Sequence, residues 1–165
     1  MNRPLLIMPA FLMVCFFAFC SAIASADVYN VKDYGAVGDG ITDDTSALQT
    51  ALNAVPENGT LYIPYGIYLT GALTRSGGIK IMGDHMGRPL APTPLGTVLK
   101  FNAVDGTMLN FYNQLNFVLE NLILAGNNAA TTLVLCGGDS FNNRTRHCLI
   151  DHCEFRDATN GLVLG

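Results

Sequence analysis

Phe117-Val118-Leu119-Glu120-Asn121-Leu122-Ile123-Leu124 is an apolar run with one Asn, and it recurs as His147-Cys148-Leu149-Ile150-Asp151-His152-Cys153-Glu154-Phe155. The two runs align with Leu119 over Ile150, which also places Glu120 over Asp151. A second pair aligns Leu133–Leu135 with Leu162–Leu164, and a related earlier run, Leu109–Phe111, aligns Leu109 with Leu133. Units of roughly 24–31 residues that hold a few short strands are typical of the coils of a β-solenoid.

The rest of the chain beyond Gly59 agrees with this interpretation. It consists of short β-prone runs separated by Gly, Asn, Asp and Pro, with no convincing helical pattern. A coil of this kind cannot bury its apolar side alone, so we expect successive coils to stack and to share one core. The span from Gly59 to Gly165 corresponds to about four coils at this repeat length.

A helix is expected before the first coil, over residues 41–55. Its apolar residues recur on one face, as Ala47, Leu48, Ala51, Leu52 and Val55. Thr42, Asp43 and Asp44 supply oxygen atoms for the helix N-terminus, and Pro56 ends the pattern. We therefore interpret the Asp43-Asp44 pair as helix capping rather than as a catalytic pair of carboxylates.

The N-terminal segment, residues 1–26, has the pattern of a secretory signal peptide. Arg3 precedes an almost entirely apolar run, and Ala24-Ser25-Ala26 is a cleavage site of small residues, so we expect cleavage between Ala26 and Asp27. The protein is then expected to be secreted, to the extracellular space or the periplasm, and to have no membrane segment after cleavage. An uncleaved membrane anchor is the alternative, although the run is short for a membrane span.

Composition excludes several functional classes. Only 13% of the residues are charged and the formal net charge is −4, whereas proteins that bind nucleic acid are usually basic. Half of the residues are hydrophobic, which excludes a disordered chain. Beyond the leader the chain keeps three cysteines, Cys136, Cys148 and Cys153, so at most one internal disulfide can form.

The segment Asp33-Tyr34-Gly35-Ala36-Val37-Gly38-Asp39-Gly40-Ile41-Thr42-Asp43-Asp44-Thr45-Ser46-Ala47-Leu48-Gln49 closely resembles the opening of the pectate lyase superfamily, including its rhamnogalacturonase- and epimerase-like members. The next run, Gly59-Thr60-Leu61-Tyr62-Ile63-Pro64-Tyr65-Gly66-Ile67-Tyr68, looks like that family's first coil. The resemblance implies an all-β fold, a right-handed parallel β-helix whose N-terminal end is capped by an α-helix. We expect a signal peptide (residues 1–26), a strand, Gly-rich loop and capping helix (27–58), and the first coils of an incomplete β-helix (59–165).

The resemblance also implies how the coils are oriented. Leu119, Leu122 and Leu124 would point inward on either side of a turn at Asn121, and His152 would occupy the same turn one coil later. Ile150, Cys153 and Phe155 would then be core, and Asp151 and Glu154 would point outward from adjacent strands.

Family enzymes act on acidic sugars, and the resemblance implies a pectin-like acidic polysaccharide as partner. The hydrolases pair two carboxylates as acid and base, and many lyases use Ca²⁺ with a basic residue. Asp151, Glu154 and Asp157 belong to the charged cluster that lies on a predicted strand, so they are the candidate catalytic residues, although ordinary exposed residues would show the same pattern. We find no metal or cofactor site, and Ca²⁺ is implied only if the full-length protein is a lyase.

Two classes of function stay open. The first is the N-terminal part of a secreted enzyme, a polysaccharide lyase or glycoside hydrolase in its full-length form, that is inactive as this piece. The second is a non-catalytic glycan-binding, adhesin or tailspike-type solenoid. The chain ends within the predicted strand at Gly161–Gly165 without a polar cap, so we expect a longer protein.

Overall fold

The computed structural model describes residues 27–84, 96–112, 116–137 and 147–164. The predicted signal peptide at residues 1–26 lies outside the described residues, so both it and its cleavage stay predictions.

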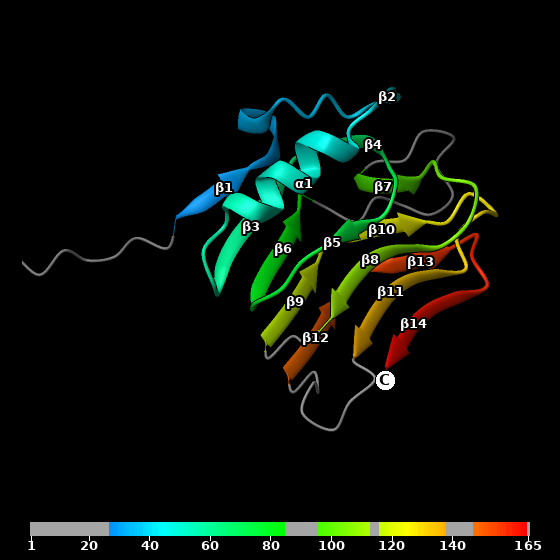
Figure 1. The fold of residues 1–165 in the computed structure, drawn as a ribbon. Coiled ribbons are helices and arrows are strands. Elements are labelled where there is room, and N and C mark those ends of the chain that lie inside the picture. The colour runs from blue at the N-terminus through cyan, green and yellow to red at the C-terminus, as the bar shows by residue number, and fades with distance from the viewer. Residues whose placement is uncertain (1–26, 85–95, 113–115, 138–146, 165) are drawn as a thin grey trace, which may run out of the picture.

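The described strands form three parallel sheets, which we name A, B and C (Figure 1). Sheet A has the order β1 (Val28–Asn30), β3 (Gly59–Ile63), β6 (Ile79–Gly83), β9 (Asn116–Glu120) and β12 (His147–Asp151). Sheet B has the order β2 (Asp39–Asp43), β4 (Gly66–Thr70), β7 (Thr97–Phe101), β10 (Leu122–Ala125) and β13 (Glu154–Arg156). Sheet C has the order β5 (Leu73–Thr74), β8 (Thr107–Tyr112), β11 (Thr132–Gly137) and β14 (Asn160–Leu164).

The chain passes from sheet A to sheet B to sheet C in each coil. This happens four times, in β3–β4–β5, β6–β7–β8, β9–β10–β11 and β12–β13–β14. Each strand pairs in parallel with its counterpart one coil later, which gives the solenoid its long-range backbone hydrogen bonds. The prediction of a right-handed parallel β-helix is confirmed.

The helix α1 (Thr45–Ala54) lies across the N-terminal end of this solenoid (Figure 1). It buries Leu48, Ala51 and Leu52, so the predicted apolar face does cover the first coil. Arg75 donates hydrogen bonds to the carbonyl groups of Leu52 and Val55 at the C-terminal end of the helix. No helix within the described ranges is long and apolar enough to cross a membrane.

The helix begins later than the sequence pattern predicts. Residues 39–43 form β2, which pairs with β4, and the preceding Val31–Tyr34 is a 3₁₀ turn, η1. Gly38 and Gly40 have φ of 66° and 78°, a left-handed backbone that interrupts any helix extending toward them. The helix predicted over residues 41–55 is therefore wrong for residues 41–44, and it ends one residue earlier than predicted, at Ala54.

The predicted alignment of the last two coils is confirmed within sheet A and within sheet B. Ile150 pairs with Leu119, Asp151 with Glu120 and Phe155 with Leu124. The side chains of Leu119, Leu122 and Leu124 are fully buried, and Asn121 and His152 are left-handed turn residues with φ of 58° and 48°. Ile150, Cys153 and Phe155 pack against the core but stay partly exposed.

The alignments predicted for sheet C were each wrong by one position. Val134, not Leu133, pairs with Leu162 in the next coil, and Val134 also pairs with Leu109 in the preceding coil. Because the side chains of a strand alternate between its two faces, this shift decides which residues share a face. Leu109 and Val134 thus stack inside, while Asn110, Leu135 and Val163 form the neighbouring row.

Candidate functional site

The outer face of sheet A carries a row of side chains across all five strands. The register aligns Asn30, Tyr62, Met82, Glu120 and Asp151, one residue from each strand. Their neighbours in β3, β6 and β9 are the buried residues of the core, so this row faces away from the interior. Since neighbouring strands lie about 4.8 Å apart, Glu120 and Asp151 bring two carboxylates onto adjacent coils.

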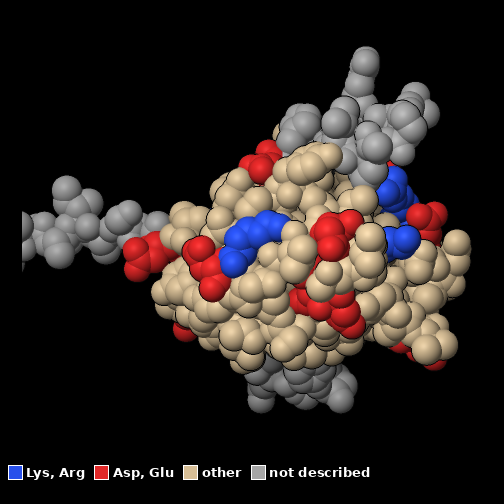
Figure 2. Space-filling model, turned by 90° about the horizontal axis from the view of Figure 1, so that it is seen from above, with Lys and Arg blue, Asp and Glu red and all other residues tan. Residues whose placement is uncertain are grey.

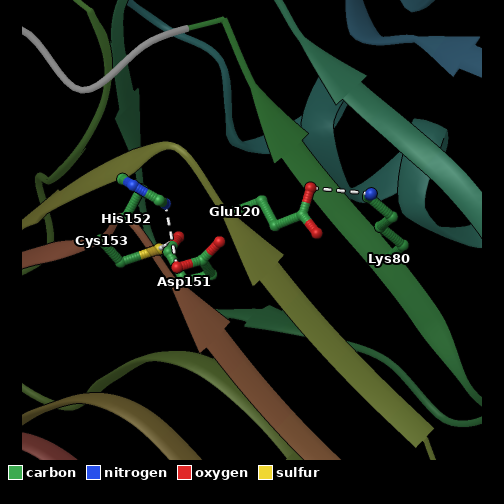
Figure 3. Close-up of polar contacts among 5 residues, drawn as sticks. All are labelled: Lys80, Glu120, Asp151, His152 and Cys153. Carbon is green, nitrogen blue, oxygen red and sulfur yellow. Dashed lines mark hydrogen bonds and ion pairs between the residues drawn. The ribbon is translucent and has the colours of Figure 1, made fainter.

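A lysine and a histidine side chain accompany these carboxylates (Figure 3). The Nζ atom of Lys80 lies 2.7 Å from Oε2 of Glu120. The Nδ1 atom of His152 lies 2.9 Å from Oδ1 of Asp151, and both of these side chains are more than half exposed. We name Lys80, Glu120, Asp151 and His152 the sheet A cluster. Its carboxylates can accept hydrogen bonds from sugar hydroxyl groups, and Lys80 offers a positive charge to an acidic group.

A third carboxylate lies at the end of β6, near the same face. Asp84 accepts a hydrogen bond from the hydroxyl of Tyr62 and another, of 2.9 Å, from the backbone N–H of Tyr65. These two bonds, the first being the stronger influence, hold the pKa of Asp84 below its ordinary value of 3.8. The bond to Asp84 also raises the pKa of Tyr62.

Acid should weaken the fold through Asp84. Because its pKa is lower in the folded chain than in the unfolded chain, its contribution is complete above about pH 4 and is lost as the pH falls further. We expect Asp84→Asn to be less stable at neutral pH and to lose less stability than the parent between neutral and acidic pH. Urea unfolding at several pH values measures this difference. Asp105→Asn, in the bend between β7 and β8, is the control and should keep the parent profile.

The three predicted catalytic residues lie on three successive parts of the last coil. Asp151 ends β12 in sheet A, Glu154 begins β13 in sheet B, and Asp157 is a left-handed turn residue after β13. Arg156 lies 3.8 Å from Glu154 and 3.9 Å from Asp157, and the imidazole of His152 lies beside Asp151. Asp151 and Glu154 do point outward from adjacent strands, as expected, but from different sheets. A catalytic role for any of the three stays a prediction.

Asp157 also borders a surface hollow. This hollow has a volume of about 300 Å³ and is lined by Asn128, Ala130, Asp157, Ala158 and Thr159. Its walls carry one carboxylate, so it does not supply the pair of carboxylates that glycoside hydrolysis requires.

The sequence did not single out Lys80, Glu120 and Asp84 as site residues. For Glu120 a signal existed, because the repeat places it directly over Asp151. Lys80 lies one coil before Glu120, and nothing in the local sequence of β6 marks the contact.

Only one residue of the Asp43-Asp44 pair caps the helix through its side chain, whereas capping was predicted for both. Asp43 caps α1 by accepting a 2.9 Å hydrogen bond from the backbone N–H of Thr45, and the Thr45 hydroxyl and N–H lower the pKa of Asp43. The carboxylate of Asp44 makes no helix-capping bond. It accepts hydrogen bonds from the backbone N–H groups of Val37 (2.6 Å) and Gly38 (2.9 Å), and it is 1% exposed. Asp44 therefore fixes the Gly-rich loop against the helix.

The described ranges hold no cluster of three carboxylates that could bind a calcium ion. Among these residues, no three His, Cys, Asp or Glu side chains come together as metal ligands would. We therefore assign no step to Ca²⁺.

Figure 2 shows the distribution of charge on the face seen from above, where acidic and basic side chains are scattered over a largely uncharged surface.

The chain is similar to a family model and to several known proteins. A family model described as rhamnogalacturonase A/epimerase, pectate lyase-like matches residues 28–159. The chain is 36% identical over 121 residues to mannuronan C5-epimerase AlgE2 of Azotobacter vinelandii, an alignment that covers 63% of this chain and 11% of that protein. It is 45% identical over 88 residues to alginate lyase 7 of the same organism, covering 47% of this chain and 9% of that protein.

A solved structure shares the fold of this chain. The A-module of mannuronan C5-epimerase AlgE4 from Azotobacter vinelandii superposes with a TM-score of 0.66 at 26% identity, covering 82% of this chain and 42% of that module. The chain thus spans about a tenth of the length of the curated relatives described above. The family model covers most of the chain, and the sheets have the expected topology: the chain belongs to the rhamnogalacturonase A/epimerase, pectate lyase-like family.

Proposed function

We propose that this chain is the N-terminal part of a secreted β-helix protein that acts on an acidic polysaccharide, and that these residues bind the polymer without converting it. The observation that carries the proposal is the sequence similarity to a mannuronan epimerase and an alginate lyase. Both names refer to uronate polymers, so we propose a polyuronate as the ligand. A pectin-like polymer and a mannuronan are two members of this class.

Binding without turnover is supported by the neighbours and the positions of the carboxylates. Glu120, Asp151, Glu154 and Asp157 each lie beside a Lys, His or Arg side chain. A hydrolase needs one carboxylic acid and one carboxylate on either side of the same sugar bond. Glu120 and Asp151 are the two that share a face, on adjacent strands of sheet A, and Lys80 and His152 each engage one of them, while Glu154 and Asp157 lie on sheet B and in a turn.

The fourth coil supports the proposal that further coils belong to the native protein. Leu162 and Leu164 continue the inward rows of β11, yet they are 39% and 66% exposed, whereas Val134 and Cys136 are at most 1% exposed. A further coil stacked on β14 would bury them. Reading the transcript beyond the codon of Gly165 tests this proposal, since an immediate stop codon would contradict it.

Secretion rests on the leader pattern of residues 1–26. The test is the N-terminal sequence of the protein recovered from the culture medium or periplasm, which should begin at Asp27. Recovery of an intact Met1 terminus from the membrane fraction would favour the anchor instead.

The activity assay uses the purified chain with polymannuronate and with polygalacturonate, each with and without Ca²⁺. Absorbance of an unsaturated product detects a lyase, proton NMR detects C5 epimerisation, and reducing ends without this absorbance detect a hydrolase. We expect none of these products from this chain. Turnover that Asp151→Ala abolishes would contradict the proposed lack of catalysis and would place the site in this coil.

Lys80 gives the binding proposal a residue-level prediction. Lys80→Met removes the positive charge of the sheet A cluster, so we expect the affinity for an oligomannuronate to fall by about twofold to fivefold at low salt. Glu120→Gln releases Lys80 from its ion pair. It also removes a negative charge that repels an acidic polymer, so it should raise the affinity. Lys100→Met, which makes the same charge change on β7 of sheet B, is the matched control. Titration calorimetry measures all three, and equal losses for Lys80→Met and Lys100→Met would exclude sheet A as the binding face.

The same carboxylate geometry favours one other function, a non-catalytic glycan-binding solenoid. It differs from the first proposal in the behaviour of the full-length protein, which would then bind polyuronate without forming product. The three product assays, applied to the full-length protein, distinguish the two functions.

A further inference from the structure

Two cysteines meet at the corner where the chain passes from sheet C into sheet A. Cys136 lies near the end of β11 and is 1% exposed, and Cys148 lies near the start of β12. Both are free thiols in the structure. The register places Cys136 over Phe111 of the preceding coil and Cys148 over Phe117.

The two phenylalanines show what this corner brings together. The rings of Phe111 and Phe117 lie against each other with their centroids 4.2 Å apart. Residues in register on parallel strands repeat the same orientation one coil later. Cys136 and Cys148 therefore occupy, in the next coil, the two positions whose side chains are in contact in this one.

The electrostatics of the thiols agree with direct contact. Burial raises the pKa of Cys136 to about 12, and the charge of the neighbouring Cys148 and a hydrogen bond with it act in the same direction. Burial also raises the pKa of Cys148, and the same hydrogen bond partly opposes this shift. This interaction between the two thiols agrees with the register, which places them side by side.

We propose that Cys136 and Cys148 form a disulfide bond that closes the junction between the third and fourth coils. The oxidant is a small disulfide such as oxidised glutathione. The thiolate of the exposed Cys148 attacks one sulfur of glutathione disulfide and releases one glutathione thiolate. The Cys136 thiolate then attacks the Cys148 sulfur of this mixed disulfide and releases the second glutathione. Two protein thiols are oxidised and one glutathione disulfide is reduced to two thiols.

The extended strand β12 disfavours Cys153 as the partner of Cys148. Cys148 and Asp151 are separated by three residue steps of extended strand, which span about 10 Å at roughly 3.3 Å per residue. A disulfide requires Cα atoms within about 7 Å of each other. Cys153 lies beyond Asp151, and its thiol donates a 3.3 Å hydrogen bond to the Asp151 carbonyl.

The test is peptide mapping of the full chain carrying Cys15→Ser and Cys20→Ser, so that Cys136, Cys148 and Cys153 are the three thiols that remain. The chain is incubated with glutathione disulfide, free thiols are alkylated, and the protein is digested without reduction. Trypsin cleaves after Arg144 and Arg146, and a protease that cleaves before Asp separates Cys148 from Cys153 at Asp151. The three cysteines then lie on three peptides.

We expect a cross-linked pair of the Cys136 and Cys148 peptides, lighter by two hydrogen atoms than the sum of the reduced peptides, and an alkylated Cys153. Cys153→Ser should form the same bond at the same rate. A cross-link from Cys153 to either other cysteine, or alkylation of all three in a chain that circular dichroism shows to be folded, would overturn the proposal.

Discussion

Gly83→Ala is expected to destabilise the β-helix by about 2–3 kcal/mol, and by more if the turn after β9 must rebuild. A Cβ atom on Gly83 would lie 2.3 Å from the backbone oxygen of Asn121 and 2.9 Å from side-chain atoms of Leu122 and Thr97. The first of these contacts cannot relax by a side-chain rotation. The backbone N–H of Asn121 also donates a hydrogen bond to Asp151 of the next coil, so moving this turn disturbs two coils at once.

Gly71→Ala is the matched control for this prediction. A Cβ atom there would meet no atom closer than 3.6 Å, which is an ordinary contact with the Thr45 hydroxyl. Its effect on the free energy of unfolding should stay within about 0.5 kcal/mol. Urea unfolding followed by circular dichroism measures both variants. Equal stability of the two would mean that β6 does not end against the Asn121 turn.

Asp44→Ala is expected to cost about 3 kcal/mol. The Asp44 carboxylate is buried and accepts two backbone hydrogen bonds from the Gly-rich loop, so its removal leaves the N–H groups of Val37 and Gly38 without these acceptors. Hydrogen bonds to a charged group are among the strongest in proteins, and the substitution removes two of them from a carboxylate that is itself buried. The loop should then detach from the helix that caps the solenoid.

Asp43→Ala provides the comparison at the neighbouring position. Asp43 is exposed and caps α1 through Thr45, so its loss should cost only about 1 kcal/mol. Thermal and urea unfolding of the two variants gives the comparison. A larger loss for Asp43→Ala than for Asp44→Ala would contradict the role assigned to the Asp44 carboxylate.

The sequence was sufficient to predict the register of neighbouring coils where a repeat contained both polar and apolar positions. The run around Asn121 could be aligned with the run around His152 because a turn residue and an acidic residue fix the parity on either side. The runs of sheet C offered no such marker. Leu133 and Val134 are both fully buried, so an apolar triplet matches its neighbour equally well in two alignments.

The candidate site was predictable only within one repeat. Asp151 stands out in its charged cluster, and the aligned repeat places Glu120 beside it. The contact of Lys80 with Glu120 depends on the pairing of β6 with β9, two strands that share no recognisable motif. The hydrogen bonds of Asp44 likewise depend on left-handed glycines that fold the loop back over the helix, a tertiary arrangement that the local helix signals did not include.

The most direct test of the proposed function is a titration of the purified chain with oligomannuronate and, in parallel, with a neutral glucan oligomer of the same length. If this part of the β-helix recognises an acidic polysaccharide, the oligomannuronate will bind, added salt will weaken the binding, and the neutral oligomer will show no binding at the same concentrations. Equal binding of the two oligomers, or no binding of the acidic one at low salt, would contradict the proposal.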